Sequence, residues 1–348
     1  MSPIRNCLAI IIFICGLILS CEDATNPYPV DESNRYDWKI DSLYEFGYPS
    51  GFSTLSALNS KKIWNCNTYG CSFYDGNKWE ELRIGYPQNI AIINSSKAFT
   101  VSLRDLFKDR VNDFYKYNGD SWDLLKLQIK DEYVYTYNYI NFLSISENEI
   151  YFVGVKVINT NQYNRAPFLI RYNDNQINEL CDIDEPLIFR NIVYDDKTKI
   201  FYIEASEIVI PNESYYYYRL YKYDGNKLSE IYNSKDQEMK IIKLDGNVYF
   251  HNDSKIFLYD GHDFIVKKDL SQFNKKVNLI KGLNLDDFYF SSFTSPNTYL
   301  YHYSKAGTSL LYTTQWIFDL LLVDDKIVFS GLNSKLAGYV AVGSKKNK

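Results

Sequence analysis

The sequence predicts an all-β fold in which one four-stranded antiparallel unit is repeated around a closed ring. Short runs of β-prone residues alternate with polar turns along most of the 348 residues. No segment shows the 3.6-residue apolar period of a helix. Two markers, described next, recur at intervals of about 44 residues, and four-stranded sheets repeated at that period are typical of a β-propeller.

The first marker is a polar turn followed by a β-prone run. It occurs seven times, each time after another short apolar run, so it predicts a hairpin between the first and second strands of each unit. The turn Asp245-Gly246 is a strong two-residue hairpin signal. The seven predicted second strands begin at Lys62, Lys97, Glu149, Lys199, Asn247, Asp287 and Lys326.

The second marker is a tyrosine that ends a strand just before another turn. The best example is Tyr74-Asp75-Gly76, which Trp79 and Leu82 follow. Asp and Gly tolerate positive φ at tight turns, so this marker predicts a hairpin between the third and fourth strands, with a structural role for its residues. The tyrosines of the six examples are Tyr74, Tyr117, Tyr172, Tyr223, Tyr259 and Tyr303.

The last unit has no fourth strand of its own. Its third strand is predicted at Ala337 to Val342, close to the end of the sequence, whereas Trp38 to Leu43 imitates the fourth strand of the first unit. An N-terminal strand that completes the last blade would close the ring without a free edge. We therefore predict seven blades in one domain, residues 36–343, with a tail at 344–348. Six blades with a degenerate last unit remain the alternative.

The first residues are predicted to lie outside this domain. Arg5 precedes an apolar run from Leu8 to Leu19, which at 1.5 Å per residue is too short for a bilayer of about 30 Å but suits a signal peptide. Residues 1–20 are therefore expected to be a signal peptide. Residues 21–35 contain two prolines and several acids, and we expect a flexible tether there.

The end of the signal resembles the lipoprotein box of bacteria, in the sequence Ile18-Leu19-Ser20-Cys21. The resemblance implies cleavage before Cys21 and a lipid on its sulfur, which would anchor the protein to a membrane. Glu22 and Asp23 resemble the acidic export signal of surface lipoproteins in Bacteroidota-like bacteria. The implied location is the bacterial cell envelope at the outer membrane, with display on the cell surface or, as the alternative, a periplasmic location. An ordinary secretory signal that contains a cysteine is the alternative.

The first repeat resembles propeller repeats of the two-component-regulator and kelch-like kinds. The matching residues are Ile63-Trp64, Thr68, Gly70, Tyr74-Asp75-Gly76 and Trp79. The paired glycine of kelch repeats is missing, and Gly76 follows Asp75 directly, unlike the glycine of a sialidase Asp box. The resemblance therefore implies the fold and transfers no catalytic activity.

After cleavage of the signal and lipidation of Cys21, three cysteines would remain as thiols, namely Cys66, Cys71 and Cys181. Cys66 and Cys71 bracket a plausible hairpin turn, so an oxidising compartment would allow a disulfide between them. Two independently buried thiols are the alternative. Cys181 has no evident partner and is expected to be a small core residue.

Composition argues against several classes of site. The net charge of −5 without a long Lys/Arg run disfavours nucleic acid, and three histidines leave little material for a metal site. No phosphate-binding, zinc-helix or nucleophile-elbow motif is present. We therefore expect no cofactor, no metal and no identifiable catalytic residue, and we interpret His251 as a core or surface histidine. A pair of catalytic carboxylates among the 43 acidic residues stays open.

Blades two to four are predicted to carry long hairpins between their second and third strands. The sequence from the second strand to the next marker tyrosine is roughly twice as long there as in blades one and five. These hairpins emerge on the same side of the ring as the crossings between blades, where Tyr and Arg would form a binding lip. Its candidate residues are Arg104, Phe107, Arg110, Tyr163, Arg165, Tyr215, Tyr216, Tyr217, Tyr218 and Arg219, beside Tyr133, Tyr135, Tyr137 and Tyr139 in a neighbouring crossing.

Two simpler interpretations of these tyrosines remain open. Tyrosine is abundant throughout, with 33 residues, and alternating tyrosines can form one face of a strand packed between blades. The function we expect is that of a monomeric, lipid-anchored binding or scaffold module for a protein or glycan partner. The alternative is a carbohydrate-active hydrolase or lyase that uses carboxylates at the ring centre. A receptor's sensory domain is disfavoured, since no membrane-spanning run follows the signal.

Overall fold

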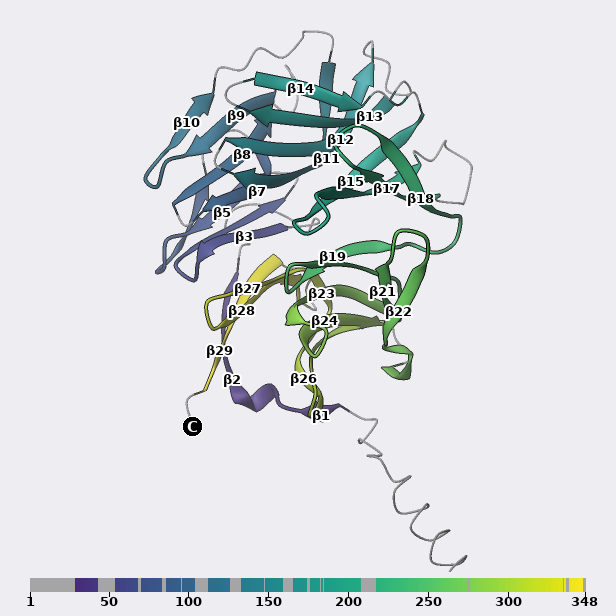
Figure 1. The fold of residues 1–348 in the computed structure, drawn as a ribbon. Coiled ribbons are helices and arrows are strands. Elements are labelled where there is room, and N and C mark those ends of the chain that lie inside the picture. The colour runs from purple at the N-terminus through teal and green to yellow at the C-terminus, as the bar shows by residue number, and fades with distance from the viewer. Residues whose placement is uncertain are drawn as a thin grey trace, which may run out of the picture.

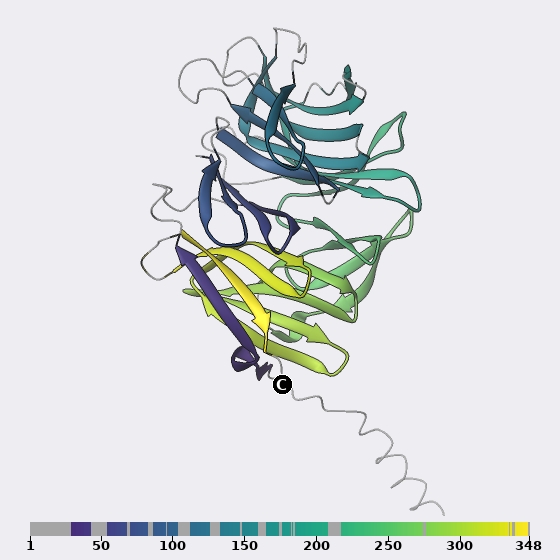
Figure 2. The ribbon, with the colours of Figure 1, turned by 90° about the vertical axis from the view of Figure 1, so that its left-hand side faces the viewer.

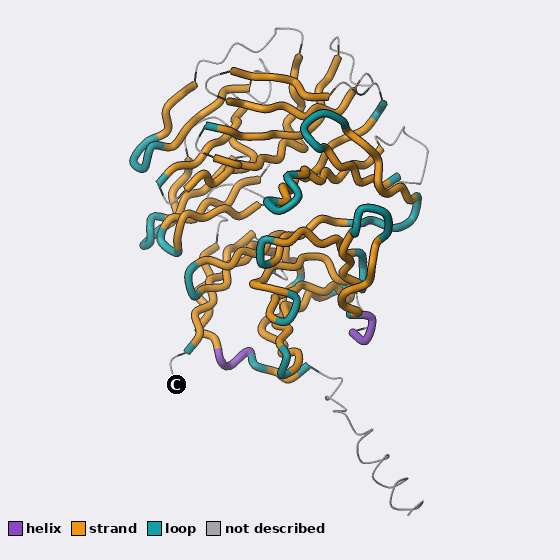
Figure 3. Tube along the Cα trace, viewed as in Figure 1, coloured by secondary structure: helices purple, strands orange, loops and turns teal. Residues whose placement is uncertain are grey.

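The computed structural model forms a ring of seven four-stranded antiparallel sheets (Figure 1). Almost all of its regular structure is strand, with short 3₁₀ helices at Ser33–Arg35 and Ser271–Phe273 (Figure 3). The predicted all-β, seven-bladed propeller is therefore confirmed. The structure describes residues 29–42, 54–67, 70–82, 86–94, 96–103, 112–125, 133–146, 148–158, 165–173, 176–181, 183, 185–207, 217–273, 276–333, 335 and 338–346.

In every blade the first strand lies nearest the centre and the others follow outward. Blades 1 to 3 are β3 (Thr54–Asn59), β4 (Lys62–Asn67), β5 (Gly70–Tyr74), β6 (Trp79–Leu82); β7 (Tyr86–Asn94), β8 (Lys97–Leu103), β9 (Asn112–Tyr117), β10 (Trp122–Leu125); and β11 (Tyr133–Ser146), β12 (Glu149–Ile158), β13 (Arg165–Asn173), β14 (Gln176–Cys181). Blades 4 and 5 are β15 (Leu187–Asp195), β16 (Ile200–Glu207), β17 (Tyr218–Tyr223), β18 (Leu228–Ser234); and β19 (Lys240–Leu244), β20 (Asn247–His251), β21 (Lys255–Tyr259), β22 (Phe264–Asp269). Blades 6 and 7 are β23 (Lys276–Asn284), β24 (Asp287–Thr294), β25 (Asn297–Ser304), β26 (Gly307–Thr314); and β27 (Trp316–Val323), β28 (Lys326–Leu332), β29 (Gly338–Lys345), β2 (Tyr36–Ser42).

The polar-turn marker predicts the second strand of every blade to within one residue. Six second strands begin at the predicted residue, and β16 begins one later, at Ile200. Lys199 belongs to the turn instead, with φ at 61°. Asp245 and Asp324 take φ values of 50° and 53° in the equivalent turns, which explains the polar residues found there.

The tyrosine marker closes the outer hairpin of a blade. The hydroxyl of Tyr117 donates to the carbonyl oxygen of Gly119 at 2.6 Å, while Asn118 Oδ1 accepts two backbone N–H groups of the turn. Gly119 has φ at 109°, a conformation that favours glycine. The same tyrosine-to-glycine bond recurs at Tyr74, Tyr223 and Tyr259. The marker therefore has a structural role.

The N-terminal strand closes the ring. β2 pairs antiparallel with β29, with Trp38 opposite Gly343, so the predicted fourth strand of the last blade is confirmed (Figure 2). Ala337 and Leu43, at the predicted limits of these strands, lie outside the described residues. The Trp38 ring packs 4.8 Å from the ring of Tyr312 and 5.5 Å from that of Phe329, measured between centroids.

Upstream of β2, residues 30–35 form a second attachment that we call the strap. β1 (Val30–Asp31) pairs in parallel with β26 of blade 6, and the 3₁₀ turn Ser33–Arg35 leads on to blade 7. The N–H of Glu32 donates to the carbonyl oxygen of Leu310 at 2.9 Å. The strap lies within the range for which the sequence predicts a tether. No helix in the described residues is long and apolar enough to cross a membrane.

The core lies between neighbouring blades. Large buried side chains such as Trp64, Phe99 and Phe189 fill the spaces between adjacent sheets. Cys66 and Cys71 form a register pair of β4 and β5, and their sulfur atoms are joined in a disulfide. Of the two possibilities left open by the sequence, the structure contains the disulfide.

Candidate functional site

The ring has two faces, and we call the one that bears the crossings between blades the crossing face. Antiparallel order places the connection from each second strand to the third on this same face. β8, β12 and β16 end there at Leu103, Ile158 and Glu207. The three long connections that the sequence predicts therefore follow these strand ends, in adjacent blades.

Most of the predicted lip residues lie outside the described residues. These are Arg104, Phe107, Arg110, Tyr163, Tyr215 and Tyr216, and the lipidation candidate Cys21 is also outside. Arg165 begins β13, where it pairs with Val157, and the tyrosines from 133 to 139 belong to the innermost strand β11.

Three predicted lip residues lie together at the start of β17. Arg219 contacts three carboxylates, with its guanidinium 2.8 Å from Glu185, 2.6 Å from Glu207 and 3.2 Å from Glu230. Tyr217 lies under the ammonium group of Lys235, 4.9 Å from the ring centroid, and Tyr218 pairs with Ser234. All three carboxylates belong to blade 4 or directly precede it, so the charge of Arg219 is already paired. This favours a structural role for Arg219.

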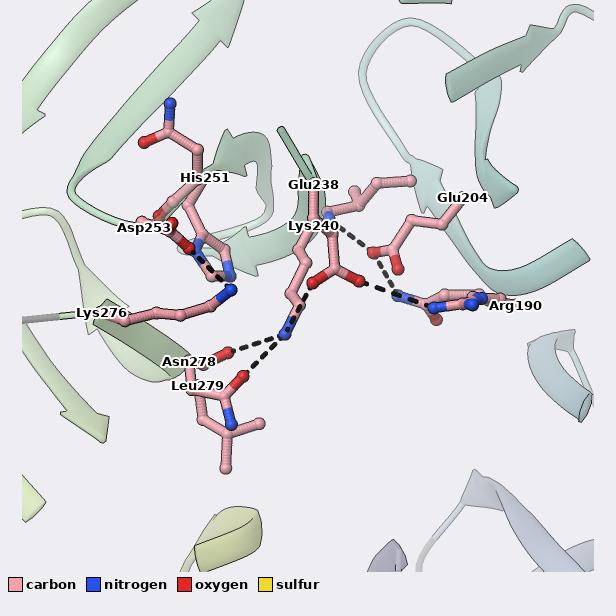
Figure 4. Close-up of polar contacts among 12 residues, drawn as sticks. Arg190, Glu204, Glu238, Lys240, His251, Asp253, Lys276, Asn278 and Leu279 are labelled. Atoms are coloured by element: carbon pink, nitrogen blue, oxygen red, sulfur yellow. Dashed lines mark hydrogen bonds and ion pairs between the residues drawn. The ribbon is translucent and has the colours of Figure 1, made fainter. Parts of the chain in front are cut away.

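A different set of side chains converges on the crossing face, at the inner rim of blades 4, 5 and 6. We call Arg190, Glu238, Lys240 and Asn278 the rim cluster (Figure 4). Glu238 lies between two cations, 3.7 Å from Arg190 Nη1 and 3.7 Å from Lys240 Nζ. Lys240 Nζ also donates to Asn278 Oδ1 at 2.8 Å. The side chains of Arg190, Glu238 and Lys240 are 33%, 26% and 28% exposed, so all three can meet a ligand.

Further groups surround the rim cluster. Lys276 Nζ pairs with Asp253 Oδ1 at 3.2 Å, and both side chains are more than half exposed. His251 lies behind them, almost fully buried, with its Nδ1 3.1 Å from the carbonyl oxygen of Asn252. Burial, and then the positive charge of Lys240, lower the pKa of His251 to about 3. The imidazole is therefore neutral near pH 7. Its burial agrees with the sequence-based interpretation of His251 as a core residue.

Partly buried polar side chains link the inner strands near the rim cluster. The amide of Asn89 donates to Asn141 at 3.1 Å, Asn141 donates to Asn191 at 3.0 Å, and Asn191 donates to Glu204 at 3.0 Å. The same Glu204 oxygen accepts the N–H of Ile241 at 2.6 Å. This chain of hydrogen bonds joins blades 2, 3, 4 and 5.

An aspartate makes the equivalent link where the ring closes. Asp319 Oδ2 accepts the N–H of Leu55 at 2.8 Å and thereby joins blade 7 to blade 1. Burial raises the pKa of Glu204 and of Asp319. Since both carboxyl groups accept backbone bonds of the next blade, their first role is to hold neighbouring blades together.

No motif named above points to the rim cluster or to these links. A repeated residue pair on the inner strands does, however, mark their positions. An Asn or Asp precedes an apolar residue on several inner strands, at Asn89-Ile90, Asn141-Phe142, Asn191-Ile192, Asn278-Leu279 and Asp319-Leu320. Lys240 precedes Ile241 in the same way. Lys240 thus stands where other blades carry a linking Asn or Asp, which indicates that this position has a different role in blade 5.

A cavity of about 530 Å³ lies on the opposite face, between blades 6 and 7 and the strap. Its lining includes His302, whose Nε2 lies 2.7 Å from Asp287 Oδ1 and whose ring stacks on Tyr289 at 4.4 Å. Its volume falls within the range of small-molecule sites. No group of three or more His, Cys, Asp or Glu side chains suited to a metal occurs in the described residues.

Comparisons with known proteins support the fold. No protein-family model matches the chain, and no curated protein matches it. The structure is similar to that of YCF48 bound to D1 peptide, with a TM-score of 0.57 at 11% identity, over 91% of this chain and 99% of that one. It is also similar to the β-propeller domain of the Trilobed protease from Pyrococcus furiosus, with a TM-score of 0.53 at 12% identity, over 86% and 96%.

A third similar structure is the extracellular domain of a hybrid two-component system from B. thetaiotaomicron. The TM-score is 0.55 at 13% identity, and the match covers 90% of this chain and 40% of that one. The Pyrococcus propeller has an open velcro topology, whereas β2 and β29 close the ring here. At these identities the comparisons show the fold alone: this chain is a seven-bladed β-propeller.

Proposed function

We propose that this protein is a binding module that engages a protein partner through the crossing face, with the rim cluster at the centre of the contact. The observation that carries the proposal is the convergence at one exposed rim of Arg190 from blade 4, Lys240 from blade 5 and Glu238 from the crossing between these blades (Figure 4). The ends of β8, β12 and β16, which lead into the long connections, lie on the same face.

The charges favour a protein segment over a neutral glycan. The rim presents cations and anions side by side, and the Lys276–Asp253 pair continues that pattern. A neutral sugar brings no charge to replace these pairs, whereas a peptide offers both charged side chains and backbone groups. The similar structure of YCF48 was determined with a bound peptide, which is compatible with this choice.

We also propose that the protein is exported to the bacterial cell envelope and held there by a lipid on Cys21. The support is the resemblance of residues 18–21 to a lipoprotein box. Each buried methylene of an acyl chain contributes about 0.8 kcal/mol to membrane binding, so two or three chains anchor a protein stably. Labelling of growing cells with radioactive palmitate should mark the wild-type protein and not C21A, and label on C21A would contradict the proposal.

Cross-linking tests the binding surface. The full-length protein, cross-linked in cell envelopes and analysed by mass spectrometry, should give partner cross-links to residues near Lys276 and Lys240. The double variant R190A/K240A should lose these cross-links. K305A is the matched control, because Lys305 is 81% exposed at the opposite face. Partner cross-links that persist in R190A/K240A, or that map to blade edges, would contradict the proposed surface.

One observation favours a second candidate function, a carbohydrate-active hydrolase. Glu204 is partly buried and its pKa is raised, while Glu238 near it lies between two cations (Figure 4). Two carboxyl groups in such different environments are typical of an acid–base pair. Against this, one Glu204 oxygen already accepts two hydrogen bonds, one from Asn191 in the same blade and one from the N–H of Ile241 in blade 5. Release of sugar from envelope polysaccharides by the wild type, and not by E238Q, would favour the hydrolase.

A further inference from the structure

We infer that Glu238 is an internal stand-in for a carboxylate of the partner, so that the rim cluster receives an acidic side chain or chain end between Arg190 and Lys240. This inference rests on the proposed function and specifies the chemistry of the partner segment. Arg190 and Lys240 attract the partner's carboxylate, and Glu238 competes with it. Asn278 orients Lys240.

The geometry of Glu238 is that of a loose occupant. Charge-assisted N–H···O bonds are usually about 2.7–2.9 Å long, whereas both contacts of Glu238 measure 3.7 Å. The Nε atom of Arg190 is buried without a hydrogen-bond partner among the described residues. A guanidinium binds carboxylates best through two parallel bonds, and Glu238 leaves that capacity unused.

The position of Glu238 allows it to give way. It lies in the crossing between β18 and β19, outside the regular strands. The next residue, Met239, is buried in the core and holds the backbone in place. Rotation of the Glu238 side chain toward solvent therefore vacates the site without moving a strand.

The remaining groups favour an anion once Glu238 has left. Arg190 and Lys240 then lose the one carboxylate that, in the described residues, lies within 3.7 Å of both. Asn278 orients the ammonium group of Lys240 through the bond of 2.8 Å, and Asp253 is already paired with Lys276. His251 is neutral and adds no charge. A carboxylate from the partner restores the balance that Glu238 maintains in the free protein.

The decisive variant is E238Q, because it removes the competing charge and keeps the side chain's size. Full-length protein in detergent is titrated into fluorescently labelled hexaglutamate, with hexaglutamine and hexalysine as comparison probes, and fluorescence anisotropy is measured. E238Q should bind hexaglutamate about two- to fivefold more tightly than wild type, as expected for a partly exposed ion pair. R190Q and K240Q should bind it more weakly by a similar factor.

E80Q is the matched control. Glu80 forms an exposed pair with Lys78 on the outermost strand of blade 1, so its substitution changes the net charge equally but far from the rim. E80Q should bind hexaglutamate like wild type, and E238Q should bind hexalysine and hexaglutamine no more tightly than wild type does. Equal affinity of E238Q and E80Q for hexaglutamate, or no binding of it by either, would overturn the inference.

The inference and the proposed function fail in different ways. If partner cross-links still map to the crossing face but E238Q shows no gain for hexaglutamate, the surface is correct and its acidic ligand is wrong. If the cross-links map elsewhere, the proposed surface itself is wrong. Equal melting temperatures of E238Q and wild type would show that the comparison reports binding.

Discussion

Glu204 of blade 4 accepts the backbone N–H of Ile241 of blade 5 at 2.6 Å, through the same oxygen that accepts the amide of Asn191. A partly buried carboxyl group therefore joins two blades close to the rim cluster. Burial raises its pKa above the usual 4.5, so the folded protein binds a proton there more readily than the unfolded chain does.

This raised pKa predicts a pH dependence of stability. The contribution of Glu204 to the free energy of unfolding is greatest below pH 4.5 and falls as the pH rises through its higher folded pKa. E204Q keeps an acceptor oxygen for Ile241 and cannot ionise, so its melting temperature should decline less than that of wild type as the pH rises above 4.5. Calorimetry at several pH values measures this. Parallel pH curves for wild type and E204Q would contradict the assignment.

His251 predicts the opposite pH dependence of the free energy of unfolding. Its folded pKa of about 3 lies below the usual 6.5, so its stabilising contribution is complete above pH 6.5 and is lost as the pH falls toward 3. H251N should therefore lose less stability between pH 6.5 and pH 4 than wild type does. H262N is the control for removal of an imidazole, since His262 is exposed in an outer turn. A steep acid loss that persists in H251N would rule out this histidine as its source.

Trp38 predicts the cost of opening the ring. A Cβ atom at Gly343 would lie 2.6 Å from the Trp38 ring, so the two residues are in close contact across the closing strand pair. W38A should lower the free energy of unfolding by about 2–4 kcal/mol, because it leaves a cavity beside Tyr312 and Phe329. The same strand offers a control, I40A, whose side chain is 53% exposed and whose loss should cost under about 1 kcal/mol. Urea unfolding measures both, and equal costs would argue against closure through Trp38.

The disulfide predicts a sensitivity to reductant. Cys66 and Cys71 close a small loop, with a sequence separation of 5, for which loop entropy gives about 2 kcal/mol of stabilisation. Dithiothreitol should lower the urea midpoint of wild type accordingly. C66S/C71S should start from the lower midpoint and show no response to dithiothreitol. An unchanged wild-type midpoint in reductant would mean that the bond contributes nothing to stability.

The sequence predicts the fold well because each blade repeats local patterns. Lys326-Ile327, for example, follows a polar turn and begins a second strand, as the equivalent pairs do in the other blades. Trp38 marks a fourth strand because its surroundings in the sequence resemble those of Trp79. Such signals depend only on residues that are adjacent in the sequence, so they can be recognised without a structure. They are enough to predict seven blades and the N-terminal closure.

The rim cluster could not be predicted in this way. Arg190, Glu238 and Asn278 are separated by about forty residues or more, and only the packing of neighbouring blades brings them together. Nothing local distinguishes Glu238 from the other acidic residues. The strap was missed for a related reason, since Val30 and Asp31 are too few to show a strand period. The predicted lip depends on residues outside the described ranges, so that part stays a prediction.

The strap also determines from which side the ring is held. Val30 pairs with Ser309 near the start of β26, just after the turn that joins β25 to β26, so the first described residues lie at the face opposite the crossings. Cys21 is eight residues before Pro29, a reach of at most about 29 Å. If Cys21 carries lipid, the bilayer lies beneath blade 6, and Arg190 and Lys240 look outward, toward whatever approaches from the surrounding medium.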